Sequence, residues 1–393
     1  MSHRPLAGLT VVDLTRYLPG PLAAHTLASL GARVIKVEEP ELGDPVRWAP
    51  PRKAGLSALG AQLLSGVESL ALDLKREGAR QVLEELLAGA DVLLETFRPG
   101  ALARLGLAPE ELRSRYSGMV ICSLSGWGQD GPLARRSGHD LTYQAVAGSL
   151  ASTAAVPSVP GADVLGASHT VTAVLAALVE RQRTGKGCWI DAALYDSAVH
   201  GNLVAWAAEA GGEHAVGEAH DLAGGLAAYD LYPTADGGRV AIALLESHFW
   251  KRFVKALKRR DLSKLHLARG SEAKTRLAEI FIERRTEEWA EFFARHDLPA
   301  EVVLSAAEAA RHPQNRARGV LRQGPEGLPR LSFPARLDGE RPAAGDRVPD
   351  LGEDTARILG SLRAGLPAAG RRSGIGRRSG LRGLLARLLS KGS

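Results

Sequence analysis

The sequence predicts an α/β protein built around a parallel β-sheet. Short apolar runs rich in Val, Ile and Leu recur through residues 1–210, helical stretches separate them, and glycine or proline marks many of the joints. Strands that alternate with helices form parallel sheets covered on both faces. Such sheets bind their ligands at the carboxyl ends of the strands.

The elements of this first part follow in chain order. "LTVVDLT" (9–15) is typical of a buried strand, and the helix after it has Pro21 in its first turn and Gly31 at its end, where those residues are favoured. Further strands are predicted at 32–40, 69–75, 91–97 and 119–126, and helices at 77–90, 109–116 and 164–183. One more strand and one more helix are predicted within 187–212.

A second domain is predicted after a glycine-rich stretch near 211–226. "YDLYPTADGGRVAIAL" (229–244) predicts a hairpin with Asp236-Gly237 at its turn, and helical segments follow to about residue 317. We therefore predict a large domain over 1–210, a small α+β domain over 225–317, a C-terminal return to the large domain over 318–366, and a basic tail over 367–393.

The composition limits the classes of protein to which the chain can belong. Apolar residues make up 45% and charged residues 24% of the 393, a soluble globular balance, and no run of 18 apolar residues predicts a membrane span. Two cysteines form no disulfide framework, which favours the cytoplasm.

Seven basic residues and no acid lie in 371–393, so without them the net charge falls from +6 to −1 and nucleic-acid binding is not expected. The leucines on one face of this tail allow a membrane contact, but a frayed extension is the favoured interpretation.

Charged side chains follow the predicted strands. Arg16, Glu38, Arg98 and His139 all lie at or just after strand ends. Neither G-x-G-x-x-G after the first strand nor G-x-x-x-x-G-K-[ST] anywhere is present, which argues against dinucleotide and P-loop sites.

The segment "SGWGQDGPLARRSGHDLTYQ" (125–144) holds the central candidate, His139, followed directly by Asp140. Imidazole accepts and donates protons near neutral pH, so His139 suits general acid–base work. A surface histidine on a turn, with Asp140 bonding only the backbone, is the alternative. Asp163 directly precedes an apolar helix, as a capping aspartate does, and Glu246 is typical of an N-cap or first-turn acid.

Several stretches resemble the family III CoA-transferases, a superfamily that includes α-methylacyl-CoA racemase. They include "GARVIKVEEPELGDPVR", "DVLLETFRPGALARLGL", "SLSGWGQDGP", "GHDLTYQAVAG", "LAALVERQRTGKG" and "DLGEDTARIL". The resemblance covers about residues 5–362, and "SGWGQDGP…GHDLTY" looks most like the racemase branch. It implies a Rossmann-like large domain, a small domain, two chains interlocked as a homodimer, an acyl-CoA substrate, and no metal or redox cofactor.

The resemblance also implies residue roles. Asp163 matches the catalytic aspartate of racemases and transferases, and Glu246 matches a glutamate that hydrogen-bonds the catalytic histidine. Arg98, Arg104 and the backbone of Ala101 match the CoA-binding motif; Arg16 and Asp140 complete the substrate-binding residues that we predict.

Three functions stay open. A racemase would invert C2 of a 2-methylacyl-CoA with His139 and Asp163 on opposite faces of the carbon. A CoA-transferase would use Asp163 as the nucleophile that forms a mixed anhydride. A non-catalytic acyl-CoA-binding homologue is the third, because Glu39 and Gly66–Glu68 stand where many members carry basic residues; Arg135 and Arg136 are alternative basic groups for CoA.

Overall fold

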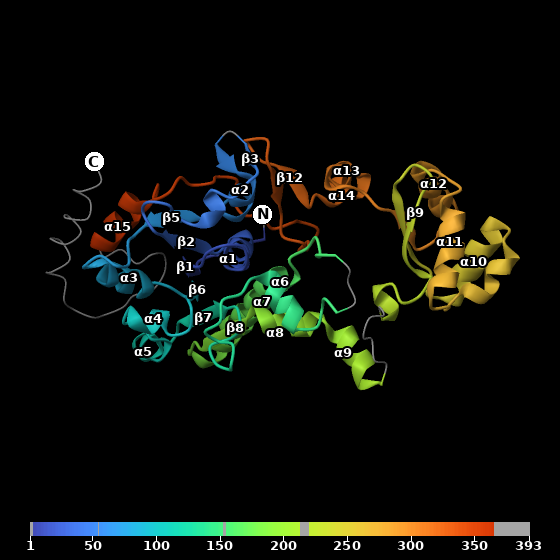
Figure 1. The fold of residues 1–393 in the computed structure, drawn as a ribbon. Coiled ribbons are helices and arrows are strands. Elements are labelled where there is room, and N and C mark those ends of the chain that lie inside the picture. Colours follow the sequence, from blue (N-terminus) through green and yellow to red (C-terminus); the bar gives the residue numbers. More distant parts are fainter. Residues whose placement is uncertain (1–2, 54, 152–154, 213–219, 365–393) are drawn as a thin grey trace. The chain divides into compact units, whose positions relative to one another are not determined.

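The computed structural model describes residues 3–53, 55–151, 155–212 and 220–364 (Figure 1). The predicted basic tail, 367–393, lies outside these residues. Contacts divide the chain into two compact units. Unit 1 comprises 1–146, 157–201 and 314–393, and unit 2 comprises 147–156 and 202–313.

Unit 1 contains the predicted parallel sheet. Its six strands are hydrogen-bonded in the order β5-β2-β1-β6-β7-β8, and every neighbouring pair is parallel. Counted along the chain this is the order 3-2-1-4-5-6 of the Rossmann fold. The strands are β1 (Thr10–Leu14), β2 (Arg33–Glu38), β5 (Glu68–Ala71), β6 (Val92–Glu95), β7 (Val120–Ser125) and β8 (Trp189–Ala193).

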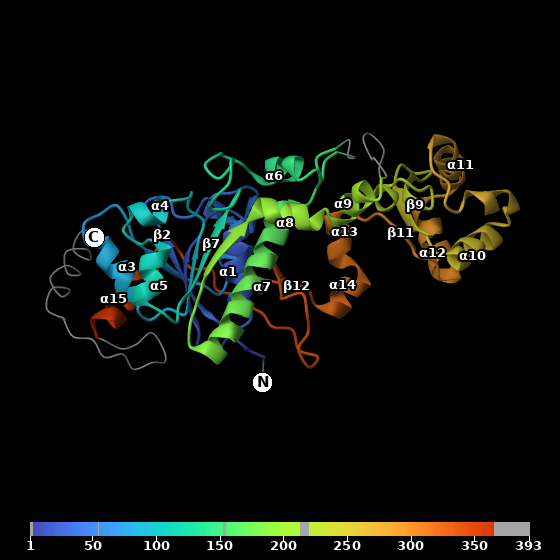
Figure 2. The same cartoon turned by 90° about the horizontal axis from the view of Figure 1, so that it is seen from below.

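Helices cover both faces of this sheet, as Figures 1 and 2 show. On β1, Val11 packs into one apolar cluster with α1 (Pro19–Ser29) and α7 (Gly161–Thr184). The next residue, Val12, packs into the opposite cluster with α3 (Ala79–Leu87) and α15 (Thr355–Arg363). Alternate side chains of a strand point to opposite faces, so adjacent valines of β1 enter the cores on the two sides of the sheet. The α/β prediction is confirmed.

Helix α7 is, by length and composition, the one described helix that could cross a membrane, with a mean hydropathy of 1.5 over an 18-residue window. It packs here against α1, α8 (Leu194–Gly201) and β7, with Val171 and Val174 in the core of unit 1. The predicted single helix after β8 is wrong. The helix ends at Gly201, Asn202 has non-helical backbone angles, and α9 (Leu203–Ala210) starts anew and clusters with unit 2.

The segment after residue 314 returns to unit 1. It forms α14 (Pro313–Arg318), the hairpin β12 (Leu321–Gln323) and β13 (Pro329–Leu331), and then α15, a helix that the prediction of strands and turns missed. The edge strand β5 is bonded from its open side: the Ser69 N–H donates to the Asp354 carboxylate at 3.0 Å, and the Ala71 N–H donates to Thr355 Oγ1 at 3.0 Å.

Unit 2 is built on a three-stranded antiparallel sheet in the order β11-β10-β9. The predicted hairpin is present as β9 (Tyr229–Pro233) and β10 (Arg239–Ala243), with Gly237 at φ +79° in the turn, and β11 (Ala300–Val302) pairs with β10. Its core is aromatic and is supplied mainly by α10 (Ser247–Leu257), α11 (Ser271–Phe281) and α12 (Thr286–His296).

The remaining elements are short. In unit 1 they are η1 (Pro45–Arg47), β3 (Arg52–Lys53), β4 (Leu56–Ser57), α2 (Ala58–Leu63), α4 (Ala101–Arg104), α5 (Pro109–Arg115) and α6 (Asp140–Val146). In unit 2 they are η2 (Asp221–Ala223), η3 (Arg260–Leu265) and α13 (Ala306–Arg311).

Candidate functional site

The candidate site begins where the strand order of unit 1 reverses, between β1 and β6. In open parallel sheets ligands bind in the crevice at this point, outside the carboxyl ends of the strands. Arg16 follows β1, and its N–H donates to Thr96 Oγ1, just after β6, at 3.0 Å. The predicted substrate-binding residue Arg16 therefore lies at the topological switch point, with its side chain exposed.

Arg98 joins this crevice to the glycine-rich segment after β7. Its guanidinium donates to Ser137 Oγ at 2.9 Å, across 39 residues of sequence. Ser137 lies two residues before His139, so the structure places Arg98 beside the loop that carries the candidate acid–base residue.

His139 is exposed and lies directly before α6, a helix that the sequence interpretation missed. Its N–H donates to Thr142 Oγ1 at 3.0 Å, and its carbonyl accepts from the Thr142 hydroxyl at 2.7 Å. These local bonds fix the backbone of His139 and leave its ring outside the helix. The ring meets Tyr17 edge to face, with centroids 6.4 Å apart.

Asp140 connects His139 to Asp163. Its Oδ1 accepts the N–H of Asp163 at 3.1 Å, and its Oδ2 accepts from Gln144 Nε2 at 2.7 Å. The predicted cap at Asp163 needs correction: α7 begins at Gly161, Asp163 lies in its first turn, and the capping carboxylate is that of Asp140. Both Asp140 oxygens thus bind protein groups, which favours a positioning role over a substrate contact.

The Asp163 carboxyl is partly buried, and its pKa is raised. Burial, and then the negative charge of Asp140, raise the pKa of Asp163 from 3.8 to about 6. Burial, followed by the charges of Asp163 and Asp140, likewise raises the pKa of the neighbouring Tyr143 to about 12. A carboxyl that titrates near neutral pH can both accept and return a proton, which is what acid–base catalysis requires.

Tyr17 is a site residue that the sequence interpretation missed. It is 55% exposed yet has a left-handed backbone with φ +70°, which is unusual for a residue other than glycine. Its N–H donates to Asp44 Oδ1 at 3.1 Å, and the Arg16 guanidinium carbon lies 5.7 Å from the centre of its ring. Strained residues of this kind cluster at functional sites. An aromatic residue shortly after the end of a predicted buried strand was the available signal.

A buried ionic group holds the Tyr17 turn. Lys36 Nζ lies 3.3 Å from Asp13 Oδ2 and 2.9 Å from Asp44 Oδ2, and it donates to the Thr15 carbonyl at 2.8 Å. All three charged side chains are only 1% exposed. The two carboxylates outweigh the cost of burying the ammonium and raise the pKa of Lys36, so the triad is a charged anchor at the carboxyl ends of β1 and β2.

The predicted CoA-binding motif forms the start of α4. Gly100 has φ +78° and allows the chain to turn into the helix, while Arg104, the last helical residue, is exposed. The Ala101 N–H donates to the Arg98 carbonyl at 2.9 Å, so a ligand would have to displace this bond to use that N–H.

Glu39 and Glu68, which stand where many family members carry basic residues, have partners within unit 1. The Glu39 carboxylate accepts the N–H groups of Glu41 and Leu42, each at 2.9 Å. Glu68 pairs with Arg33 at 2.8 Å and Arg357 at 3.3 Å. Gly66 has φ +75°, and a Cβ there would come within 2.6 Å of the Gly345 nitrogen. These residues serve the packing of unit 1 instead of supplying cationic donors.

Glu246 belongs to unit 2. It occupies the N-cap position of α10, as one of the two sequence interpretations expected, but its exposed side chain makes no capping bond. Its pairing with His139, which lies in unit 1, stays a prediction. Across the described ranges no group of three or more His, Cys, Asp and Glu is arranged to hold a metal ion.

Comparison with known proteins decides the family. The family model described as CoA-transferase family III matches residues 6–355. The chain belongs to CoA-transferase family III. The chain is 32% identical to alpha-methylacyl-CoA racemase of Homo sapiens over 372 residues, which cover 90% of this chain and 92% of that protein. It is 31% identical to acetyl-CoA:oxalate CoA-transferase of Acetobacter aceti, over 90% of this chain and 95% of that one.

Solved structures give the same assignment. A CAIB/BAIF family protein from Brucella suis superimposes with a TM-score of 0.79 at 31% identity, covering 92% of this chain and all of that one. The predicted family, its α/β fold and the expectation of a family III enzyme are therefore confirmed. The interlocked homodimer stays a prediction.

Proposed function

We propose that this family III member is an acyl-CoA racemase or epimerase that inverts C2 of a 2-methyl-branched acyl-CoA. One observation carries the proposal: the Asp140 carboxylate holds the first turn of α7 against the segment that bears His139. The imidazole of His139 and the carboxyl of Asp163 are thereby presented from two elements linked by a single residue. The similarity to human alpha-methylacyl-CoA racemase supports the choice of substrate class.

The chemistry needs two proton-transfer groups. One group removes the proton at C2, and the electron pair of the broken C–H bond delocalises onto the thioester oxygen as an enolate. The second group, protonated at the start, delivers its proton to the opposite face of C2. The configuration inverts, and the two groups exchange protonation states. First-turn N–H groups of α6 are our candidate donors to the enolate oxygen, although those of Thr142 and Tyr143 would first have to leave the His139 carbonyl.

The raised pKa of Asp163 fits this role. At about 6, it lies close enough to neutral pH for both the carboxylate and the carboxylic acid to be populated during turnover. Glu246 is the proposed partner of the His139 imidazole, where it would fix the tautomer. Arg16, Arg98 and Arg104 are the proposed contacts for the phosphates of CoA, for which guanidinium groups are well suited.

A CoA-transferase is the second candidate, favoured by the similarity to the Acetobacter transferase. There the Asp163 carboxylate attacks the thioester carbonyl, the C–S bond breaks, CoA leaves as the thiolate, and an acyl–aspartyl anhydride remains. This step requires an ionised carboxylate, which a pKa of about 6 disfavours below that pH. A non-catalytic acyl-CoA-binding homologue is the third candidate, because Glu39 and Glu68 bond to other protein groups.

The proposal includes a homodimeric, cytoplasmic enzyme. Proton transfer at C2 of a thioester balances with protein groups alone, so we propose that no metal or redox cofactor takes part. Coenzyme A is present only as the thioester of the substrate.

A chiral 2-methylacyl-CoA incubated in D2O separates the three candidates. Deuterium entry at C2 with loss of optical purity is expected for the racemase. Transfer of CoA to an added carboxylic acid without exchange identifies the transferase. Binding with neither reaction identifies the non-catalytic homologue. His139→Ala measured in the same assay tests whether exchange depends on this site.

A further inference from the structure

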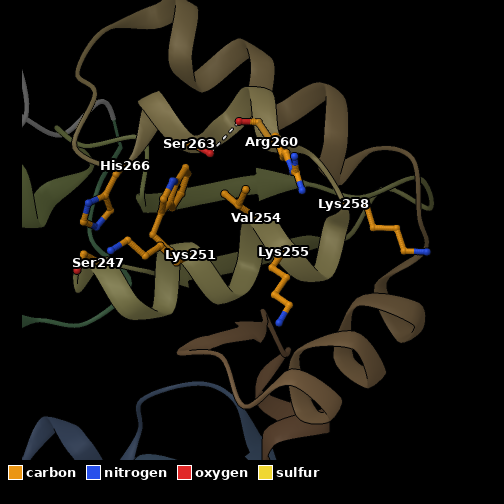
Figure 3. Close-up of a pocket in the computed structure, with 9 residues that line it drawn as sticks. Ser247, Lys251, Val254, Lys255, Lys258, Arg260, Ser263 and His266 are labelled. Atoms are coloured by element: carbon orange, nitrogen blue, oxygen red, sulfur yellow. Dashed lines mark hydrogen bonds between the residues drawn. The ribbon is translucent and has the colours of Figure 1, made fainter.

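We propose that unit 2 carries a binding site for a phosphate-bearing anion, in a pocket between α10 and η3. The cavity has a volume of about 520 Å³, within the range of small-molecule sites. Figure 3 shows it in close-up. Nine residues line it: Ser247, Trp250, Lys251, Val254, Lys255, Lys258, Arg260, Ser263 and His266.

The charge of the lining is wholly positive. Four lining side chains are cationic, none is acidic, and within the described ranges none of the four cations pairs with a carboxylate: Lys251, Lys255, Lys258 and Arg260. Figure 3 shows Lys251 at the same end as Ser247 and His266, while Lys255 and, just after the helix, Lys258 lie toward the other end. A cavity with this lining attracts anions.

Two arginines next to the pocket residues in sequence, unlike those residues, do pair with carboxylates. Arg252, next to Lys251 in sequence, pairs with Asp297 at 2.9 Å, and Arg259, next to Arg260, pairs with Asp261 at 2.9 Å. Acids are thus present around α10 but are absent from the pocket. Lysines at the C-terminal end of a helix are favoured by its dipole, which accounts for Lys255 in the last turn and Lys258 at the C-cap without a ligand. It does not account for Lys251, in the middle of α10, or for Arg260.

The uncharged polar groups of the pocket are largely engaged by the protein, so the cations carry the attraction for an anion. His266 Nε2 lies 2.7 Å from the Leu245 carbonyl, and the Ser263 hydroxyl donates to the Arg260 carbonyl at 2.8 Å. Trp250 and Val254 provide an apolar wall, and the indole N–H is already bonded to the Leu262 carbonyl at 3.2 Å. Phosphate oxygens accept charge-assisted hydrogen bonds from ammonium and guanidinium groups, so a phosphate ester matches this lining.

Calorimetric titration with inorganic pyrophosphate tests the site on the full chain. Lys251→Gln and Arg260→Gln should each weaken binding by about three- to tenfold, as expected for partly exposed charged contacts. Lys264→Gln is the matched control: it removes the same charge from η3, but Lys264 does not line the cavity. Binding should also weaken between 50 and 300 mM NaCl, because salt screens the attraction between exposed charges.

Two results would overturn the site: absence of pyrophosphate binding, or equal weakening by Lys264→Gln and the two pocket variants. Addition of CoA then identifies the source of the phosphate. If CoA leaves the pyrophosphate titration unchanged, the site takes a free phosphorylated ligand; if it competes, and does so less in Lys251→Gln, the phosphate is that of CoA. Both outcomes are measured by binding and not by turnover, so failure of this site can be distinguished from failure of the racemase proposal.

Discussion

Asp163 combines a proposed catalytic role with a cost to stability. Between pH 3.8 and about 6 the folded chain keeps a proton on this carboxyl that the unfolded chain releases, so the free energy of unfolding falls as pH rises through that window. Asp163→Asn should abolish inversion and yet stabilise the fold by about 1 to 2 kcal/mol at pH 8, after allowance for partial solvent exposure. At pH 3.5 the gain should vanish. Urea unfolding at both pH values measures it, and an equal change at the two would contradict the explanation.

The charge of Asp140 affects the pKa of the Asp163 carboxyl. Because its negative charge contributes to the raised pKa of Asp163, Asp140→Asn should lower that pKa and move the acidic limb of the kcat/KM profile to lower pH. An asparagine oxygen can still accept the Asp163 N–H, so the first turn of α7 should persist. Asp130→Asn removes an equal charge from the preceding loop and should leave the limb near pH 6. A limb that stays in place in both variants would show that another group controls it.

The contact between β7 and α6 leaves no room for a side chain at Gly126. A Cβ there would lie 2.2 Å from the Tyr143 hydroxyl oxygen, and Tyr143 is itself packed on Trp127 with ring centroids 4.9 Å apart. Gly126→Ala should therefore displace α6, lower the free energy of unfolding by about 1 to 3 kcal/mol and reduce kcat. Gly360→Ala, in α15 with open space around its Cβ, should stabilise by about 0.5 to 1 kcal/mol. Chemical denaturation and turnover measure both variants.

The buried triad ties β1, β2 and the Tyr17 turn together. Lys36→Met would leave Asp13 and Asp44 buried without a counter-charge, which should cost about 3 to 5 kcal/mol at pH 7. Part of that loss should return at pH 5, because burial raises the pKa of the Asp13 carboxyl, which can then take up a proton. Urea titrations at the two pH values test this, with Lys53→Met, an exposed lysine, as the control. A loss no larger than that of the control would remove the triad as the anchor of the turn.

The elements of the sheet were predictable and the links between them were not. β1, β2, β6 and β7 are buried on both faces, and their Val, Ile and Leu residues identify them in the sequence, although Asp13 and Lys36 interrupt the apolar pattern. α6 has seven residues and α15 has nine, and helices this short depend on tertiary packing for their stability. His139 and Asp163 were found from motifs, but the Asp140 bridge joins residues 23 apart, and Tyr17 required the backbone angle.

For the whole molecule, the basic residues of 371–393 determine the net charge but lie outside every proposed contact. A chain ending at Leu366 should keep its turnover on soluble substrate, while its net charge changes from +6 to about −1. It should therefore lose retention on a cation exchanger at pH 7. Loss of turnover with an unchanged unfolding transition would place the tail in the active site.

The side-chain bonds on β5 have a consequence for biosynthesis. Ser69 receives its edge partner, Asp354, 285 residues later in the chain, and the 202–313 part of unit 2 is synthesised in between. During synthesis on the ribosome, the open edge of β5 therefore lacks these hydrogen-bond partners until nearly the whole polypeptide has emerged. An uncovered strand edge is a template for pairing with other chains. The edge of β5 is thus open to pairing with other chains from its own synthesis until Asp354 and Thr355 have left the exit tunnel.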